Sequence, residues 1–185
     1  MKRYYLRARA IVRKFQKDNE GATAIEFAIV AIPFFMLAFG IIELAIIFFI
    51  NSTLTHSVSE AGRQIRVGLF QPCGGEAEFK ALVCEGMNNM AGCSDNVVIN
   101  VMTAPSFKDI SPPKPDPDTG VLPPASYIET TAGQPVVVQA LFKYDLALPA
   151  QLTRLNSTPG SNSRILQAST AFRNEPFPDG GACGG

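Results

Sequence analysis

Apolar residues along this chain form one long block near the N-terminus, followed by shorter periodic stretches. Residues 22–50 read ATAIEFAIVAIPFFMLAFGIIELAIIFFI, and only Glu26 and Glu43 interrupt them with charge. A helix that spans a bilayer needs about 20 apolar residues. A helix on the surface of a soluble domain would show a polar face, whereas here Phe and Ile fall on every face. The pattern predicts a single membrane-spanning helix.

After residue 50 the pattern becomes a single apolar stripe with polar residues on the other faces. The stripe recurs at steps of three or four residues and consists of Leu54, Val58, Ala61, Ile65 and Leu69. This spacing predicts that the membrane helix continues as an amphipathic stalk. Gly68 followed by Pro72 predicts its end.

Shorter patterns in the rest of the chain predict one small domain. Residues 76–89 fit a short helix, and four runs predict strands, the first through its β-branched residues and the last through its alternation. These runs are residues 96–103, 127–131, 135–146 and 164–173. Residues 104–124 hold seven prolines, which predicts a loop. The expected fold is α+β, with the long helix packed on a small antiparallel sheet and a short extra helix.

Three segments follow from these patterns: a basic leader over residues 1–21, a transmembrane and stalk helix over residues 22–70, and an outer domain over residues 71–185. Seven basic residues lie among the first 20, although the formal net charge of the chain is zero. The positive-inside rule then places the N-terminus in the cytoplasm and the outer domain beyond the inner membrane. A cleaved secretory signal peptide is the competing interpretation. Its apolar core of about 7–15 residues is much shorter than this run.

All four cysteines follow the apolar block, which suits an oxidising compartment. They allow three pairings, of which we favour Cys84–Cys93 with Cys73–Cys183, although the sequence does not decide between them. A zinc site with four thiolate ligands is the alternative. Their spacings of 11, 9 and 90 include no C-x-x-C pair, so we expect no metal.

Candidate catalytic chemistry is sparse. His56 is the single histidine, one helical turn before Glu60, and Ser52 or Ser59 could complete a Ser-His-acid set. No pocket or oxyanion signal accompanies them, so we interpret them as a solvated helix face. We therefore expect no enzyme and no cofactor. The zero net charge gives no indication of a nucleic-acid partner.

The junction between the leader and the apolar block carries a further motif. A basic leader ends at Gly21, the apolar helix starts at Ala22, and Glu26 is its fifth residue. This resembles the processing site of type IV pilin-like proteins, which implies a cut by a prepilin peptidase between Gly21 and Ala22. A carboxylate at the centre of a bilayer costs about 2.5–3.5 kcal/mol, and less near its edge. The resemblance implies that Glu26 pairs with the new N-terminal amine of a neighbouring subunit. The alternative is that Glu26 reaches the inner headgroups.

Two stretches narrow the resemblance further. The N-terminal one contains Gly21-Ala22, Glu26-Phe27, Pro33, Glu43 and Ala61-Gly62-Arg63, and the C-terminal one reads ASTAFRNEPF over residues 168–177. Both resemble TadE-like proteins, the minor pilin-like components of Tad (tight adherence) pilus systems. The resemblance implies a structural subunit whose partners are the bilayer, the prepilin peptidase, other pilin-like subunits and Tad assembly proteins. The alternative is an uncleaved single-pass envelope protein whose outer domain binds a ligand or a partner.

Glu43 lies 17 residues after Glu26, or about 25 Å along a helix. If Glu26 lies near the inner interface, Glu43 lies near the outer one. We expect its side chain at the level of the outer headgroups.

Overall fold

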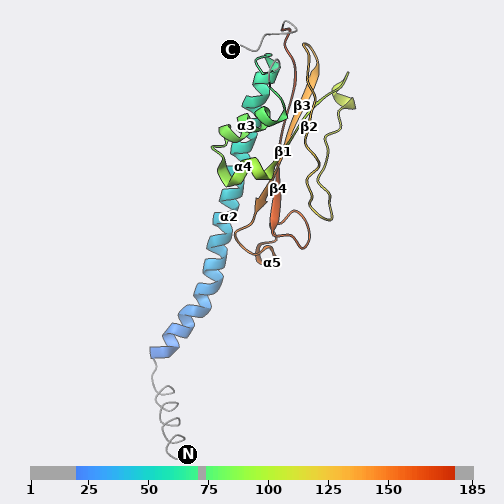
Figure 1. Cartoon of the computed structure of the whole chain (residues 1–185). Helices are drawn as coiled ribbons and strands as arrows, with labels where there is room; N and C mark the ends of the chain where they lie inside the picture. The colour runs from blue at the N-terminus through green and yellow to red at the C-terminus, as the bar shows by residue number, and fades with distance from the viewer. Residues whose placement is uncertain (1–19, 71–73, 178–185) are drawn as a thin grey trace, which may run out of the picture. The chain divides into compact units, whose positions relative to one another are not determined.

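The computed structural model of the chain describes residues 20–70 and 74–177 (Figure 1). The basic residues of the predicted leader therefore lie outside the described residues, as do Cys73 and Cys183. The chain divides into two compact units, residues 1–42 and residues 43–185. The C-terminal part of the long helix thus belongs to the second unit, together with the sheet.

Helix α2 (Glu20–Arg66) contains both the predicted membrane span and the predicted stalk, and it continues through Pro33. Most of the stalk stripe is buried, with four members no more than 2% exposed. They are Leu54, Val58, Ala61 and Ile65. The fifth, Leu69, is 73% exposed because the helix ends at Arg66.

The end of α2 is built around Gly68. Its φ of +76° lies in the left-handed region, which glycine adopts without steric cost. This conformation lets Gly68 N donate to Ile65 O at 3.0 Å and Leu69 N donate to Gln64 O at 3.0 Å. These bonds satisfy carbonyl groups that the last helical turn would otherwise leave unpaired.

The sheet has four strands in the order β2-β1-β3-β4. They are β1 (Val97–Thr103), β2 (Ser126–Tyr127), β3 (Pro135–Asp145) and β4 (Ser163–Arg173). The β1–β3 and β3–β4 pairs are antiparallel, as the sequence predicts, so the α+β fold class is confirmed. The short β2 instead pairs parallel with β1, which makes the sheet mixed. The proline-rich connection between them is long enough to return the chain for a parallel pairing, which a tight hairpin turn cannot do.

Short helices complete the second unit. They are α3 (Glu76–Gly86), α4 (Cys93–Asn96), α5 (Ala150–Thr153) and the 3-10 turns η1 (Met90–Gly92) and η2 (Phe107–Asp109). Cys84 of α3 and Cys93 of α4 form a disulfide bond with their Cα atoms 5.5 Å apart. This bond closes the connection between the two helices.

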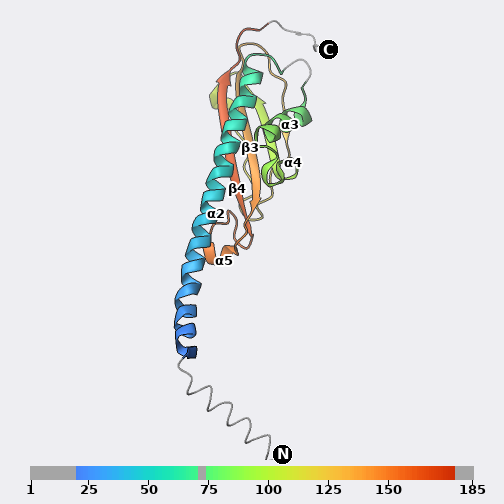
Figure 2. The same cartoon turned by 90° about the vertical axis from the view of Figure 1, so that its left-hand side faces the viewer.

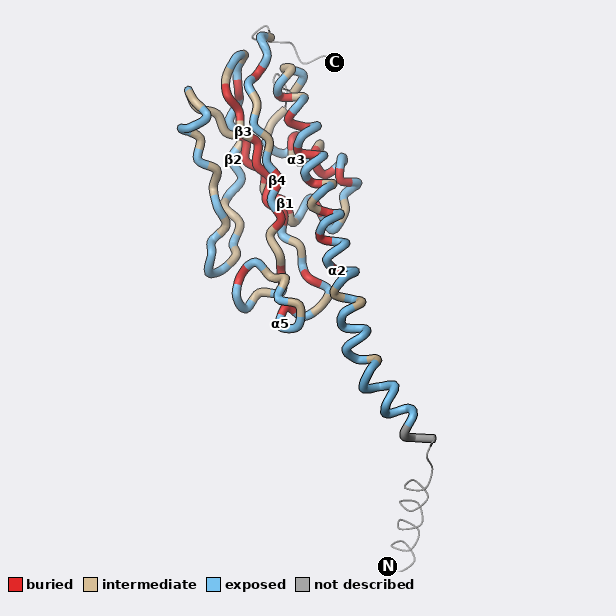
Figure 3. The backbone as a smooth tube through the Cα atoms, turned by 180° about the vertical axis from the view of Figure 1, so that it is seen from behind, coloured by how far each residue is buried: buried red, intermediate tan, exposed pale blue. Residues whose placement is uncertain are grey.

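The core lies between the sheet and the helices. Every second residue of β3 is fully buried there: Val136, Val138, Ala140 and Phe142. Side chains from α2 and α3, such as Leu54 and Phe79, join the same cluster. Figure 2 shows the later part of α2 running along β4, and Figure 3 shows buried residues on the strands and on one side of this part of α2.

Candidate functional site

The first half of α2 exposes an apolar surface. Its large apolar side chains from Ile25 to Ile42 are between 47% and 71% exposed. Within the described residues, one helical segment, Thr23–Arg66, is long and apolar enough to cross a membrane. So much exposed apolar surface is unusual on a soluble monomer and marks contact with lipid or with another protein.

The first turns of this helix carry the predicted processing and assembly residues. Gly21 and Ala22 lie at the start of α2, which begins at Glu20. Glu26 follows on the next turn, and its side chain is exposed. Among the described residues, the Glu26 carboxylate has no hydrogen-bond partner and no ion-pair partner. The described residues therefore leave this group available to a partner.

Glu43 has the opposite surroundings. Its side chain is only 3% exposed. Its Oε1 accepts hydrogen bonds from Ala147 N at 2.6 Å and Leu148 N at 3.3 Å, and Oε2 accepts from Leu148 N at 3.3 Å. Hydrogen bonds to a charged group are each worth about 1.5–3 kcal/mol. Glu43 thus fastens the connection between β3 and β4 to the long helix.

The Glu43 side chain is bonded within its own unit, and its position at the level of the outer headgroups stays a prediction. The chain after β3 returns to α2 and presents two backbone N–H groups to the carboxylate. Tyr144, near the end of β3, lies close to the Glu43 carboxylate. Burial and the negative charge of Glu43 both raise the pKa of Tyr144. Sequence spacing along one helix gives no indication of a partner that lies 104 residues further along the chain.

The two stretches that carry the family resemblance meet at the end of α2. At Gly62, a Cβ would lie 2.9 Å from Thr170 Cγ2 and 3.0 Å from Phe172 Cε1, so only glycine allows this approach. Arg66 Nη2 pairs with Glu175 Oε1 at 3.0 Å, and Glu175 N donates to Arg66 O at 2.9 Å. We call this set of contacts the helix-end clasp.

A buried asparagine supports the clasp. Asn174 is 3% exposed, and its Nδ2 donates to Thr130 Oγ1 at 2.8 Å and to Thr131 O at 2.9 Å. Its backbone N donates to Gln134 O at 2.9 Å. These bonds fix the chain as it leaves β4, and they place Glu175 opposite Arg66. The F-R-N-E-P motif therefore has a structural explanation within this chain.

The other predicted residues are accounted for by the structure. His56, Glu60, Ser52 and Ser59 lie exposed on α2, and Glu60 pairs with Arg63 at 2.9 Å. The Arg63 guanidinium lowers the pKa of Glu60 through their hydrogen bond. Cys84 and Cys93 are joined to each other, so neither is a free thiolate for a zinc ion. The other predicted pair, Cys73–Cys183, lies outside the described residues.

Comparison with known proteins gives one match. The family model described as TadE-like protein matches residues 21–63. The predicted resemblance to TadE-like proteins is thereby confirmed for this segment, which begins at Gly21 and includes Glu26 and Glu43. Neither a curated protein nor a solved structure matches the chain. The ASTAFRNEPF stretch lies beyond the matched segment, so its family assignment stays a prediction.

Proposed function

We propose that this chain is a minor pilin-like subunit of a Tad-type pilus system and that it helps to initiate or support assembly of the pilus. The observation that carries the proposal is the contrast between two carboxylates of α2. Glu43 is buried and bonded within its own unit, whereas Glu26 is exposed on an apolar helix without a partner among the described residues. A charged side chain within a membrane helix is stabilised by a partner, and another subunit would supply it here.

Processing would create that partner. Cleavage between Gly21 and Ala22 by a prepilin peptidase would leave a positively charged amine on Ala22, at the membrane edge. The carboxylate of Glu26 on one subunit would pair with the amine of its neighbour. The charge of each group would then be compensated only after processing and on assembly. The role is structural, without catalysis.

The proposed topology places the N-terminus in the cytoplasm, α2 across the inner membrane and the second unit outside the cytoplasm. The basic residues before Glu20 and the disulfide of the second unit both support this orientation. In this topology the partners are the bilayer, the peptidase and other pilin-like subunits with their assembly proteins. Entry into the filament and residence in the membrane are both compatible with it.

Mass spectrometry of the mature N-terminus tests the processing step. In cells with an active prepilin peptidase we expect the purified chain to begin at Ala22. Gly21→Ala should block this cleavage, whereas Gly40→Ala, in the same helix but away from the junction, should leave it intact. An intact Met1 on the wild-type chain would contradict the processing step.

A second experiment tests the pairing. Glu26→Gln removes the charge of the side chain and keeps its size. We expect this variant to be cleaved normally but to lose recovery of the chain with its pilus components after crosslinking in intact cells. Glu60→Gln, on the exposed face of α2 in the second unit, is the matched control. Unchanged crosslinking of Glu26→Gln would show that the amine pairing is wrong.

A second candidate function is that of an uncleaved single-pass envelope protein whose outer unit binds a ligand, and the cavity described below supports only the ligand-binding part of it. The same N-terminal measurement separates the two candidates. A chain that begins at Ala22 favours the pilin-like subunit, and a chain that retains its leader favours the uncleaved protein.

A further inference from the structure

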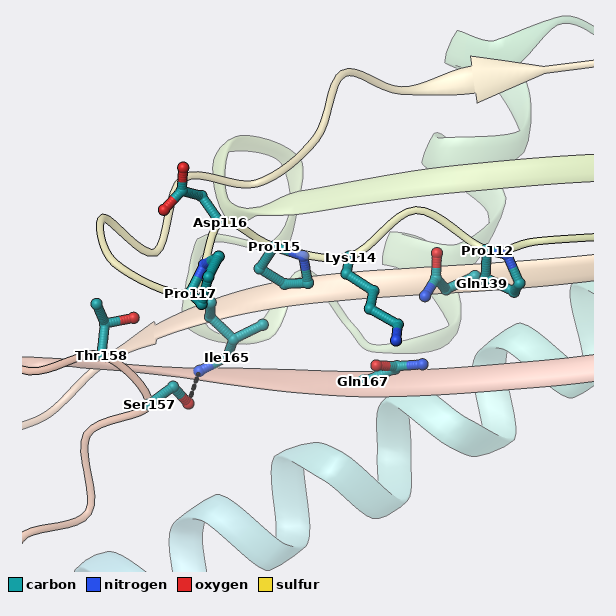
Figure 4. A pocket seen from close by; sticks show the side chains of 10 residues that line it. All are labelled: Pro112, Lys114, Pro115, Asp116, Pro117, Gln139, Ser157, Thr158, Ile165 and Gln167. Carbon is teal, nitrogen blue, oxygen red and sulfur yellow. Dashed lines mark hydrogen bonds between the residues drawn. The ribbon is translucent and has the colours of Figure 1, made fainter.

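The second unit contains a cavity whose lining residues all lie outside α2. Its volume is about 520 Å³, and it lies between the proline-rich connection and the face of β3 and β4 that carries Gln139 and Gln167 (Figure 4). Ligand pockets in proteins commonly have volumes of about 300–1,000 Å³. The cavity is therefore large enough for a small ligand.

The outer wall of the cavity is held in shape by its own hydrogen bonds. Asp116 Oδ1 accepts from Asp118 N at 2.9 Å and from Thr119 N at 2.8 Å. Gly120 N donates to Asp116 O at 2.9 Å, which closes a tight turn. Gly120 also approaches Thr158 so closely that a Cβ would lie 2.7 Å from Thr158 Oγ1. This contact joins the proline-rich connection to the loop before β4.

That loop is fixed to β4 in turn. Ser157 N donates to Ser163 O at 3.1 Å, and Ile165 N donates to Ser157 Oγ at 2.9 Å. The walls are therefore ordered before any ligand arrives, and ordering them on binding costs little free energy.

The floor of the cavity contains a buried amide. Gln139 is 1% exposed, and its Oε1 accepts from Asn100 Nδ2 at 3.4 Å. No described residue accepts a hydrogen bond from Gln139 Nε2. Gln139 thus offers a donor to whatever occupies the cavity.

Other lining residues add charged and uncharged hydrogen-bonding groups. Figure 4 shows the side chains of Lys114 and Gln167 pointing toward one another across the cavity. The hydroxyl of Ser157 accepts from Ile165 N, and its proton stays available to donate. Figure 4 shows the Asp116 carboxylate pointing away from the other lining side chains, and its Oδ1 is bonded to Asp118 N and Thr119 N, so it belongs to the outer wall and not to the groups that face a ligand.

The lining disfavours two ligand classes. Lys114 brings a positive charge to the lining, whereas the Asp116 carboxylate points away from it, so a cation is disfavoured. A proline-rich peptide needs an aromatic-lined groove, and no described lining residue is aromatic.

We propose that this cavity binds a neutral oligosaccharide. Each sugar hydroxyl both donates and accepts a hydrogen bond, which matches the mixture of amide, hydroxyl and ammonium groups. The C–H faces of a sugar ring would lie against the prolines and Ile165. The inference is independent of the proposed assembly function, since no cavity residue lies on α2.

Calorimetric titration of the full chain tests the proposal. The protein is kept in a zwitterionic detergent, because detergents with sugar head groups would compete. Maltotriose, mannotriose and chitotriose serve as probes. We expect at least one to bind, and Lys114→Ala and Gln167→Ala each to weaken binding by about tenfold through the loss of a hydrogen-bonding group.

The matched controls are Lys108→Ala, in the same connection, and Ser169→Ala, on the same strand as Gln167. Both are exposed and lie outside the cavity lining, so binding should be unchanged. Circular dichroism checks that each variant is folded. Failure of all three sugars to bind overturns the proposal, as does equal binding by the wild type and Gln167→Ala. Displacement of a bound sugar by a proline-rich peptide would assign the cavity to peptides instead.

Discussion

Residues 23–42 and residues 43–66 belong to one continuous helix, yet their apolar side chains have different surroundings. Phe27, Phe34 and Phe39 in the first stretch are at least half exposed, whereas Leu54, Val58 and Ile65 in the second are buried. Both stretches are rich in large apolar residues. The difference comes from the rest of the chain, which supplies a sheet and a short helix to the second stretch within one compact unit.

The two glutamates follow the same division. Glu43 begins the second unit and receives backbone N–H groups from it, whereas Glu26 receives none from the described residues. A polar group in an apolar helix is stabilised only by a partner. The second stretch therefore packs within its own unit, whereas the described residues give the first stretch no such packing. Four substitutions test this division, each against a matched change in the other stretch or on another face.

The largest expected effect is that of Leu54→Ala. Leu54 is completely buried, so its truncation should lower the free energy of unfolding by about 2–5 kcal/mol through lost burial and a new cavity. Phe39→Ala, at a side chain that is 52% exposed, is the matched control and should change it by about 0.5 kcal/mol or less. Chemical denaturation of the full chain in detergent, followed by circular dichroism, measures both. Equal losses would contradict the division of the helix.

Glu43→Leu should have the next largest effect. It leaves Ala147 N and Leu148 N without their acceptor, at a cost of roughly 1–3 kcal/mol for each group that stays buried. Glu26→Leu makes the same change where no such bond exists. It should leave unfolding of the second unit within about 0.5 kcal/mol of the wild type. The same denaturation experiment compares them, and a neutral Glu43→Leu would mean that water replaces the carboxylate.

Particular residues show what sequence reasoning could reach. The stripe of Leu54, Val58, Ala61 and Ile65 was predictable because one helix contains the whole period. Strands β3 and β4 were predictable because the apolar run of the first and the alternation of the second are local patterns. The parallel pairing of β2 was not predictable, because a strand of two residues shows no clear alternation of apolar and polar positions. Its direction depends on how the proline-rich connection returns.

The roles of Glu43 and of the helix-end clasp were also beyond the sequence. Spacing along α2 identified Glu43 as unusual, but its partners lie more than 100 residues away and are backbone groups of any residue type. The ASTAFRNEPF stretch was noticed only through resemblance. That it meets Gly62 and Arg66 could not be inferred without the fold. The cavity could not be inferred from the sequence either, because its walls come from residues 112–117 and 155–163, which only the fold brings together.

Gly62→Ala tests the close approach of α2 to β4. The added Cβ would lie 2.9 Å from Thr170 Cγ2, so the strand or the helix must shift, at a cost of about 1–3 kcal/mol. Gly40→Ala is the control, because a Cβ there meets nothing within 4 Å. In a helix it should be neutral or stabilise by up to about 1 kcal/mol. Thermal unfolding in detergent distinguishes the two variants. We expect Gly62→Ala to lower the unfolding temperature and Gly40→Ala to leave it unchanged or raise it.

The smallest effect concerns the ion pair of the clasp. Arg66 and Glu175 are about half exposed, so their pair is worth only about 0.2–1 kcal/mol. Glu175→Gln should lower the free energy of unfolding by that amount at low salt. The loss should shrink above about 0.5 M salt, because screening weakens exposed pairs. Glu60→Gln, which breaks the i,i+3 pair with Arg63 inside one helix, is the control.

The Arg66–Glu175 pair joins two distant parts of the chain, so Glu175→Gln should also increase hydrogen exchange at the end of β4, and Glu60→Gln should not. Equal exchange in both variants would mean that the backbone bond from Glu175 N to Arg66 O holds the clasp without the ion pair.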